Sequence, residues 1–132
     1  MFSPALQSVF ANAAVPQKCV LIVLLAAIPA IVVAALLALR GGVKARVWGL
    51  VISYLGAAGL TLGLLVGGLN SFHMGETIKR LPVEPTLKQL APGIFEVSTL
   101  VGLGALVGVL AVVAHAAIGL FAAKQRTSAN AA

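Results

Sequence analysis

The sequence predicts an all-α integral membrane protein built from three transmembrane helices. Hydrophobic residues make up 61% of the chain and charged residues only 9%, whereas globular domains carry about 25% charged residues. The apolar residues form three continuous blocks, each of at least about 20 residues, which is the length that a helix needs to cross a bilayer. These blocks are too long for core helices and too continuous for the alternating strands of a barrel.

A single membrane domain is expected over residues 1–132. Its predicted segments are an interfacial N-terminal segment, a first span, a second span, an outer loop, a third span and a cytoplasmic tail, at 1–17, 18–40, 47–72, 73–92, 93–123 and 124–132. Three prolines in the outer loop argue against a long helix there. At 1.5 Å of rise per residue the third span is longer than the bilayer is thick, so it should tilt or protrude.

The N-terminal segment has the pattern of a short helix. Ser3 and Pro4 resemble an N-cap followed by proline at the first helical position. Leu6, Val9 and Phe10 then recur at helical spacing, which favours a short interfacial helix on the outer leaflet. A disordered terminus is the alternative interpretation.

Basic residues determine the predicted orientation of the spans. Five of them lie in the link between the first two spans and after the third, namely Arg40, Lys44, Arg46, Lys124 and Arg126. Four lie on the other side, namely Lys18, Lys79, Arg80 and Lys88. Because Lys and Arg are enriched in cytoplasmic segments, the N-terminus is predicted outside and the C-terminus inside.

Several classes of function are excluded by composition and by missing motifs. The basic residues behind the net charge of +6 are scattered at helix ends, where they anchor spans, so no nucleic-acid partner is expected. One cysteine, Cys19, allows neither an intramolecular disulfide nor a multi-thiolate metal site. The chain has no phosphate-binding glycine loop, no H-E-x-x-H and no nucleophile with a plausible base, so we expect no enzyme, cofactor or metal.

Glycines recur along one face of the second and third spans. The predicted packing positions are Gly56, Gly59, Gly63, Gly67, Gly104 and Gly108. Small residues on one stripe let another backbone approach closely, so these faces are expected to pack against helices. Thr61 is the one hydroxyl in the middle of the second span and is an ion-pathway candidate, or else a side chain bonded to its own backbone.

Glu96 is the only acidic residue within the three apolar blocks, and it lies in the first turns of the third span. An intramembrane carboxylate is a functional-site hypothesis by default. Glu96 and Thr99 are three residues apart and project from one helix face, so both are ion-pathway candidates. The alternative is that Glu96 only complements the helix dipole at the interface. His115, further along the same span, is expected to bond to a neighbouring helix rather than to relay protons from Glu96.

Two short segments resemble the paired-helix signature of the MotA/TolQ/ExbB proton-channel superfamily, nearest to its ExbB and TolQ branch. The first runs from Gly63 to Phe72 at the end of the second span, and the second runs from Leu90 to Glu96. The motif positions, besides Glu96, are Asn70, Ser71, Phe72, Ala91, Pro92 and Gly93. With the helices around these segments, the similarity extends from about Leu55 to Leu120, roughly half of the chain.

The resemblance implies a homo-oligomeric ring in the bacterial inner membrane, usually five-fold, whose second and third helices line a pore. Single-span partners resembling ExbD or TolR, each with a membrane aspartate, occupy that pore, and the proton motive force drives envelope work or transport. Glu96 then lies at the outer mouth of the pore. Threonines of the family pattern are replaced here by Leu64 and Val101, and the large cytoplasmic segment between the first two spans is reduced to a short link.

Two other functions remain open at the level of sequence. One is a non-conducting structural scaffold of a membrane transport or secretion complex, which would use the same glycine faces for assembly. The other is a small holin-like pore former, because three short spans and a basic tail suit that class.

Overall fold

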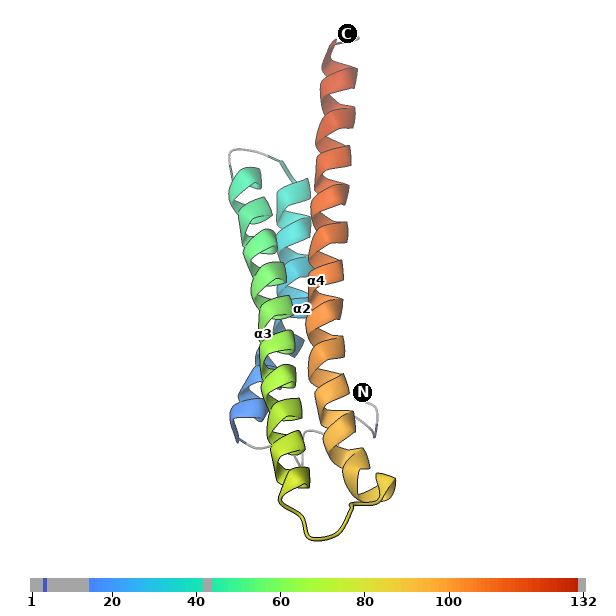
Figure 1. Ribbon diagram of the computed structural model, residues 1–132. Coiled ribbons are helices and arrows are strands. Elements are labelled where there is room, and N and C mark those ends of the chain that lie inside the picture. The colour runs from blue at the N-terminus through green and yellow to red at the C-terminus, as the bar shows by residue number, and fades with distance from the viewer. Residues whose placement is uncertain (1–3, 5–14, 42–43, 131–132) are drawn as a thin grey trace.

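The computed structural model describes residue 4 and residues 15–41 and 44–130, and within these ranges the chain contains helices but no strands. The helices are α2 (Val15–Leu39), α3 (Ala45–Lys79) and α4 (Leu87–Asn130) (Figure 1). Each is long and apolar enough to cross a membrane. The predicted all-α class is therefore confirmed, with three helices that are long and apolar enough to span a membrane. The expected interfacial segment falls largely outside the described residues, and its last residues, Val15–Gln17, belong to α2.

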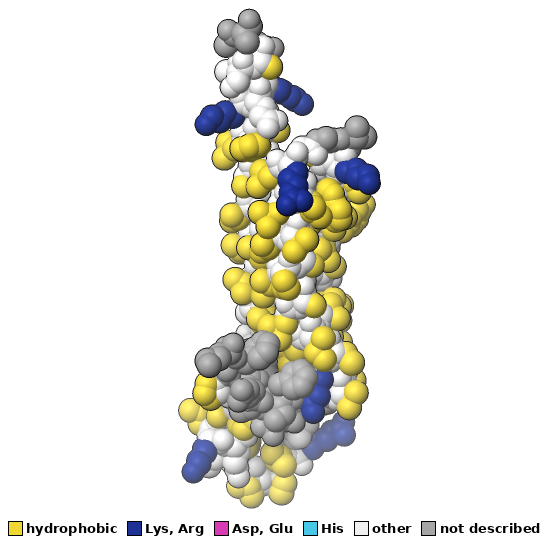
Figure 2. All heavy atoms as spheres, turned by 180° about the vertical axis from the view of Figure 1, so that it is seen from behind, with side chains coloured by type: hydrophobic (Ala, Val, Ile, Leu, Met, Phe, Trp, Pro, Cys, Tyr) yellow, Lys and Arg dark blue, Asp and Glu magenta, His cyan; other side chains and the backbone are white. Residues whose placement is uncertain are grey.

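The three helices form an elongated bundle in which each packs against the other two (Figure 1). The most extensive contact is between α3 and α4. The side chains that are fully buried come from all three helices, namely Leu21, Leu24, Ile31, Ile52, Leu100 and Val107. Many other large apolar side chains are exposed, and Figure 2 shows apolar side chains along the middle of the bundle with Lys and Arg at its two ends. Such a surface suits a hydrocarbon surrounding.

The helices differ in length, and this determines where the bundle ends. With 25 residues, α2 is about 37 Å long, close to the thickness of a bilayer. With 44 residues, α4 is about 66 Å long, and its C-terminal end projects beyond the other two helices (Figure 1). Leu120, in the C-terminal part of α4, is 75% exposed. The protrusion agrees with the excess length expected from the sequence.

The connection between α2 and α3 is short, as the sequence indicates. Gly41 follows the last turn of α2 with a φ of 75°, in the left-handed region where glycine has no steric penalty. Its backbone N–H donates to the Ala38 carbonyl oxygen at 3.1 Å, which satisfies one of the free acceptors at the helix end. This tight ending lets α3 turn back against α2.

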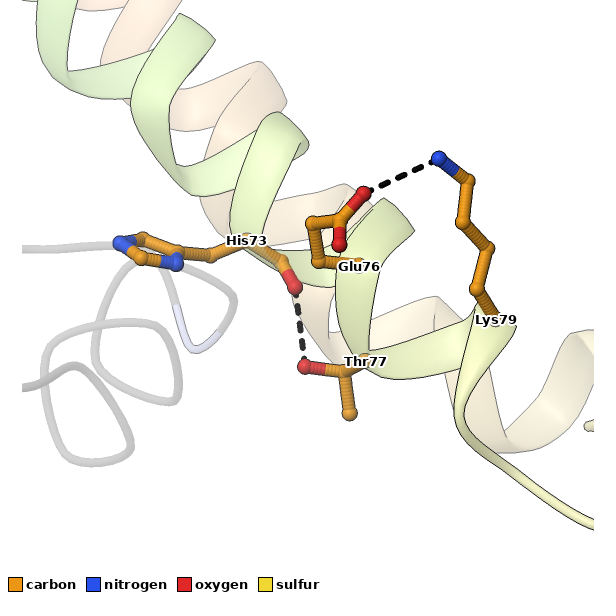
Figure 3. A network of polar contacts seen from close by, with 4 residues as sticks. All are labelled: His73, Glu76, Thr77 and Lys79. Atoms are coloured by element: carbon orange, nitrogen blue, oxygen red, sulfur yellow. Dashed lines mark hydrogen bonds and ion pairs between the residues drawn. The ribbon is translucent and has the colours of Figure 1, made fainter.

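The connection between α3 and α4 is shorter than the expected loop over 73–92. The helices continue to Lys79 and begin again at Leu87, so only residues 80–86 lie between them. Residues 73–79 include four polar side chains, yet they belong to α3, and three of these side chains bond within the helix. Lys79 Nζ lies 3.0 Å from Glu76 Oε1, and Thr77 Oγ1 donates to the His73 carbonyl oxygen at 2.9 Å (Figure 3).

Two further boundaries differ from the sequence-based expectation. Pro92 lies inside α4 rather than before it; its ring removes one helical hydrogen bond, and the first turns of α4 bend away from the rest of the helix (Figure 1). At the other end α4 stays helical to Asn130, so most of the expected tail over 124–132 extends the third span. Residues 131 and 132 lie outside the described residues.

Candidate functional site

The glycine stripe of α3 lies directly against α4. A Cβ atom added at Gly63 would lie 2.7 Å from the Cα atom of Gly104 and 2.7 Å from the Leu100 carbonyl oxygen. A Cβ added at Gly104 would in turn lie 2.8 Å from the Gly63 Cα atom and 2.9 Å from the Gly59 carbonyl oxygen. The two backbones are therefore in contact at this crossing, which is the role that small residues play between membrane helices.

The other predicted packing glycines follow the same register. Added Cβ atoms at Gly56 and Gly59 would overlap the side chains of Ala111 and Val107. At Gly67 an added Cβ would lie 2.6 Å from Val101 Cγ2. The packing around Gly108 is less tight, because an added Cβ there would lie 3.4 Å from Leu60 Cβ, an ordinary contact distance.

Glu96 lies on the face of α4 that packs against α3. It precedes Leu100 by four residues and Gly104 by eight, and both of these are buried, so the three residues share one stripe. The side chain of Asn70 on α3 lies beside its carboxyl group. The carboxyl atom Oε1 is buried and has no hydrogen-bond partner among the described residues. The carboxyl group therefore lies between two helices rather than on the outside of the bundle.

The two halves of the sequence signature meet across the α3–α4 interface. Asn70 from the first half contacts Glu96 from the second. One turn further out, a Cβ added at Gly93 would lie 2.8 Å from Met74 Sδ, so a glycine there again allows close approach. The remaining motif residues, Ser71, Phe72, Ala91 and Pro92, are exposed. Of the signature residues, Asn70 and Gly93 therefore lie against the opposing helix, and Glu96 supplies a carboxylate between the two helices.

Neither hydroxyl candidate joins this pair. Thr99 Oγ1 donates to the Phe95 carbonyl oxygen of its own helix at 2.7 Å, so its proton is already bonded within α4. Thr61 is exposed on α3, two residues from Gly63 and therefore about 200° around the helix from it. Of the positions where the family carries threonine, Leu64 is exposed and Val101 packs against Gly67.

A second polar contact between α3 and α4 involves Ser53, which the sequence did not single out. Ser53 Oγ lies 3.4 Å from His115 Nδ1 and donates to the Gly49 carbonyl oxygen at 3.2 Å. The hydroxyl has only one proton, so Nδ1–H of the imidazole is the donor to Oγ. His115 therefore bonds to a neighbouring helix, as expected from the sequence. The sequence places Ser53 one turn after Gly49. That position indicates a contact with α4 only once the alignment of α3 against α4 is known.

The described residues hold no group of three or more His, Cys, Asp or Glu side chains that could bind a metal ion. Comparisons of the chain with protein-family models, with curated proteins and with solved structures found no match.

Proposed function

We propose that this protein is an ExbB/TolQ-like subunit of the bacterial inner membrane that couples the proton motive force to envelope work or transport. In this proposal copies of the chain form a homo-oligomeric ring, most simply a pentamer, around the membrane helices of a single-span partner. The partner resembles ExbD or TolR and carries a membrane aspartate. The N-terminus lies outside and the C-terminus inside.

The observation that carries the proposal is the contact between Asn70 and Glu96. These residues belong to the two separate halves of the sequence signature, and the register of the glycine contacts brings them together. A carboxylate at the end of a membrane span, held between two helices with one oxygen lacking a partner, is a group that can take up and release a proton. The close packing at Gly63 and Gly104 supports a fixed geometry around it.

The non-conducting scaffold is the second candidate, and the hydroxyl positions favour it. A proton pathway past Glu96 needs water or hydroxyl partners, because an unsatisfied polar group in an apolar surrounding costs several kcal/mol. Leu64 and Val101 supply none, and the Thr99 hydroxyl is bonded to its own helix. In the ring proposal the membrane aspartate of the partner and its bound water must provide the missing partners.

Reconstitution with the partner tests the proposal. We expect liposomes that hold this chain together with a single-span ExbD- or TolR-like protein, which carries a membrane aspartate, to take up protons under an imposed potential, as followed by a pH-sensitive dye. Liposomes with either protein alone should take up none. Uptake by this chain alone would instead support the holin-like pore former, and a complex that assembles without proton uptake would support the scaffold.

A further inference from the structure

A groove runs between α3 and α4 on the side of these helices away from α2. Its volume is about 800 Å³. Many of its lining residues are small, among them Gly56, Ala57, Ala105 and Gly108, and Leu60 and Val112 line it as well. No residue of α2 lines it, and of its lining residues only Ala111 belongs to the core cluster that α2 shares. The groove is therefore an open surface of the single chain.

The groove has the length of one leaflet of a bilayer. It follows α4 from Ala105 to Ala116, a distance of about 17 Å at 1.5 Å of rise per residue, against about 15 Å for half of the hydrocarbon core. Along α3 it extends from Leu60, near the middle of the second span, to Ser53. One end thus lies near the centre of the bilayer and the other near its surface.

The surface end of the groove is polar and lies at the end of the bundle that carries only basic residues. Ser53 and His115 line it and bond to each other. Arg46 is exposed and lies seven residues before Ser53, two turns away on the same face of α3. The basic residues of this end are Arg40, Lys44, Arg46, Lys124 and Arg126, whereas all three acidic residues, Glu76, Glu84 and Glu96, belong to the other half of the bundle.

We infer that the groove binds a phospholipid with an anionic headgroup. An acyl chain fills the groove between α3 and α4, and the phosphate lies at the surface end, near Arg46 and the Ser53–His115 pair. Basic sites between membrane helices hold anionic headgroups in this way. The inference goes beyond the proposed function because it needs only one chain. In the proposed ring, whose centre α3 and α4 line, the groove faces that centre and the lipid lies between the ring and the partner helices. The lipid site and the Asn70–Glu96 pair lie toward opposite ends of the bundle, so the lipid leaves that pair accessible.

Native mass spectrometry of the purified protein in detergent tests this inference. With phosphatidylglycerol added we expect a retained lipid adduct for each chain, and with phosphatidylcholine of the same acyl chains a much weaker one. Inorganic phosphate should give no adduct, which separates a lipid headgroup from a free anion. Arg46→Gln should weaken phosphatidylglycerol retention about fivefold, the effect of one basic side chain near an anionic lipid. Arg80→Gln, at the other end of the bundle, is its control.

The acyl part of the site is tested by filling the groove. Ala105→Leu should lower retention about tenfold, because it displaces about two methylene contacts. Ala30→Leu, on the exposed face of α2, adds the same side chain outside the groove and should change nothing. Equal retention in Ala105→Leu and Ala30→Leu would overturn the inference. So would a loss of oligomers in Ala105→Leu with unchanged lipid retention, since that result assigns the groove to a neighbouring protein helix.

Discussion

Replacing Gly63 by leucine is expected to separate α3 from α4 and to destabilise the bundle more than any other single change along the glycine stripe. The new Cβ atom would lie 2.7 Å from both the Gly104 Cα atom and the Leu100 carbonyl oxygen. Both are backbone atoms, which cannot rotate away as a flexible side chain can. Overpacking typically costs about 1–3 kcal/mol, and a backbone clash should place Gly63→Leu at about 3 kcal/mol or more in the free energy of unfolding.

The chain offers matched controls for this experiment. Gly68 in α3 and Gly102 in α4 have no atom within 4 Å of an added Cβ, so Gly68→Leu and Gly102→Leu insert the same side chain into open space. Unfolding of the three variants in mixed micelles, by titration with a denaturing detergent, measures the difference. Equal stability of Gly63→Leu and Gly68→Leu would contradict the helix contact described here.

Replacing Glu96 by glutamine is expected to reduce proton uptake about a hundredfold or more in liposomes that also hold the partner, the scale on which a positioned proton-transfer group contributes. Glutamine has nearly the same shape and remains a polar neighbour of Asn70, but it cannot take up and release a proton. The stability and the assembly of Glu96→Gln should therefore match those of the wild type. Only the transport readout should change.

Glu76→Gln is the matched control, because Glu76 is a carboxylate of the same chain that pairs with Lys79 at the end of α3. Liposomes that hold Glu76→Gln and the partner should take up protons at the wild-type rate. Loss of the ion pair should not disturb the fold, since an exposed pair of this kind contributes little to stability. If Glu96→Gln conducts as well as Glu76→Gln, the carboxylate has no part in a proton pathway. The scaffold would then be the better description of the protein.

The parts of the fold that depend on hydrophobic length and on glycine spacing were predictable from sequence. A block of about 20 apolar residues has few alternatives to a membrane helix, and the stripe of Gly56, Gly59, Gly63 and Gly67 lies on the face that contacts α4. Helix ends outside the apolar blocks were not predictable in this way. Polarity at 73–79 resembled a loop, but the Glu76–Lys79 pair is equally compatible with a helix that leaves the hydrocarbon.

The candidate site was only partly predictable, because it depends on the register between two helices. Spacing along α4 places Glu96 and Thr99 on neighbouring positions, yet it does not reveal that the Thr99 hydroxyl bonds to Phe95. Asn70 and Glu96 are separated by the end of α3, the connector and the start of α4, so their contact follows only once Gly63 is set against Gly104. The Ser53–His115 bond and the groove beside it depend on the same register.

The central claim is that copies of this chain surround the membrane helices of a partner, and an electron cryomicroscopy structure of the complex in lipid nanodiscs tests it most directly. The sample should contain the chain expressed together with a single-span ExbD- or TolR-like protein that carries a membrane aspartate. The proposal predicts a closed ring with α3 and α4 lining its centre and partner helices inside. A monomer, or an oligomer whose centre holds no partner helix, would contradict it.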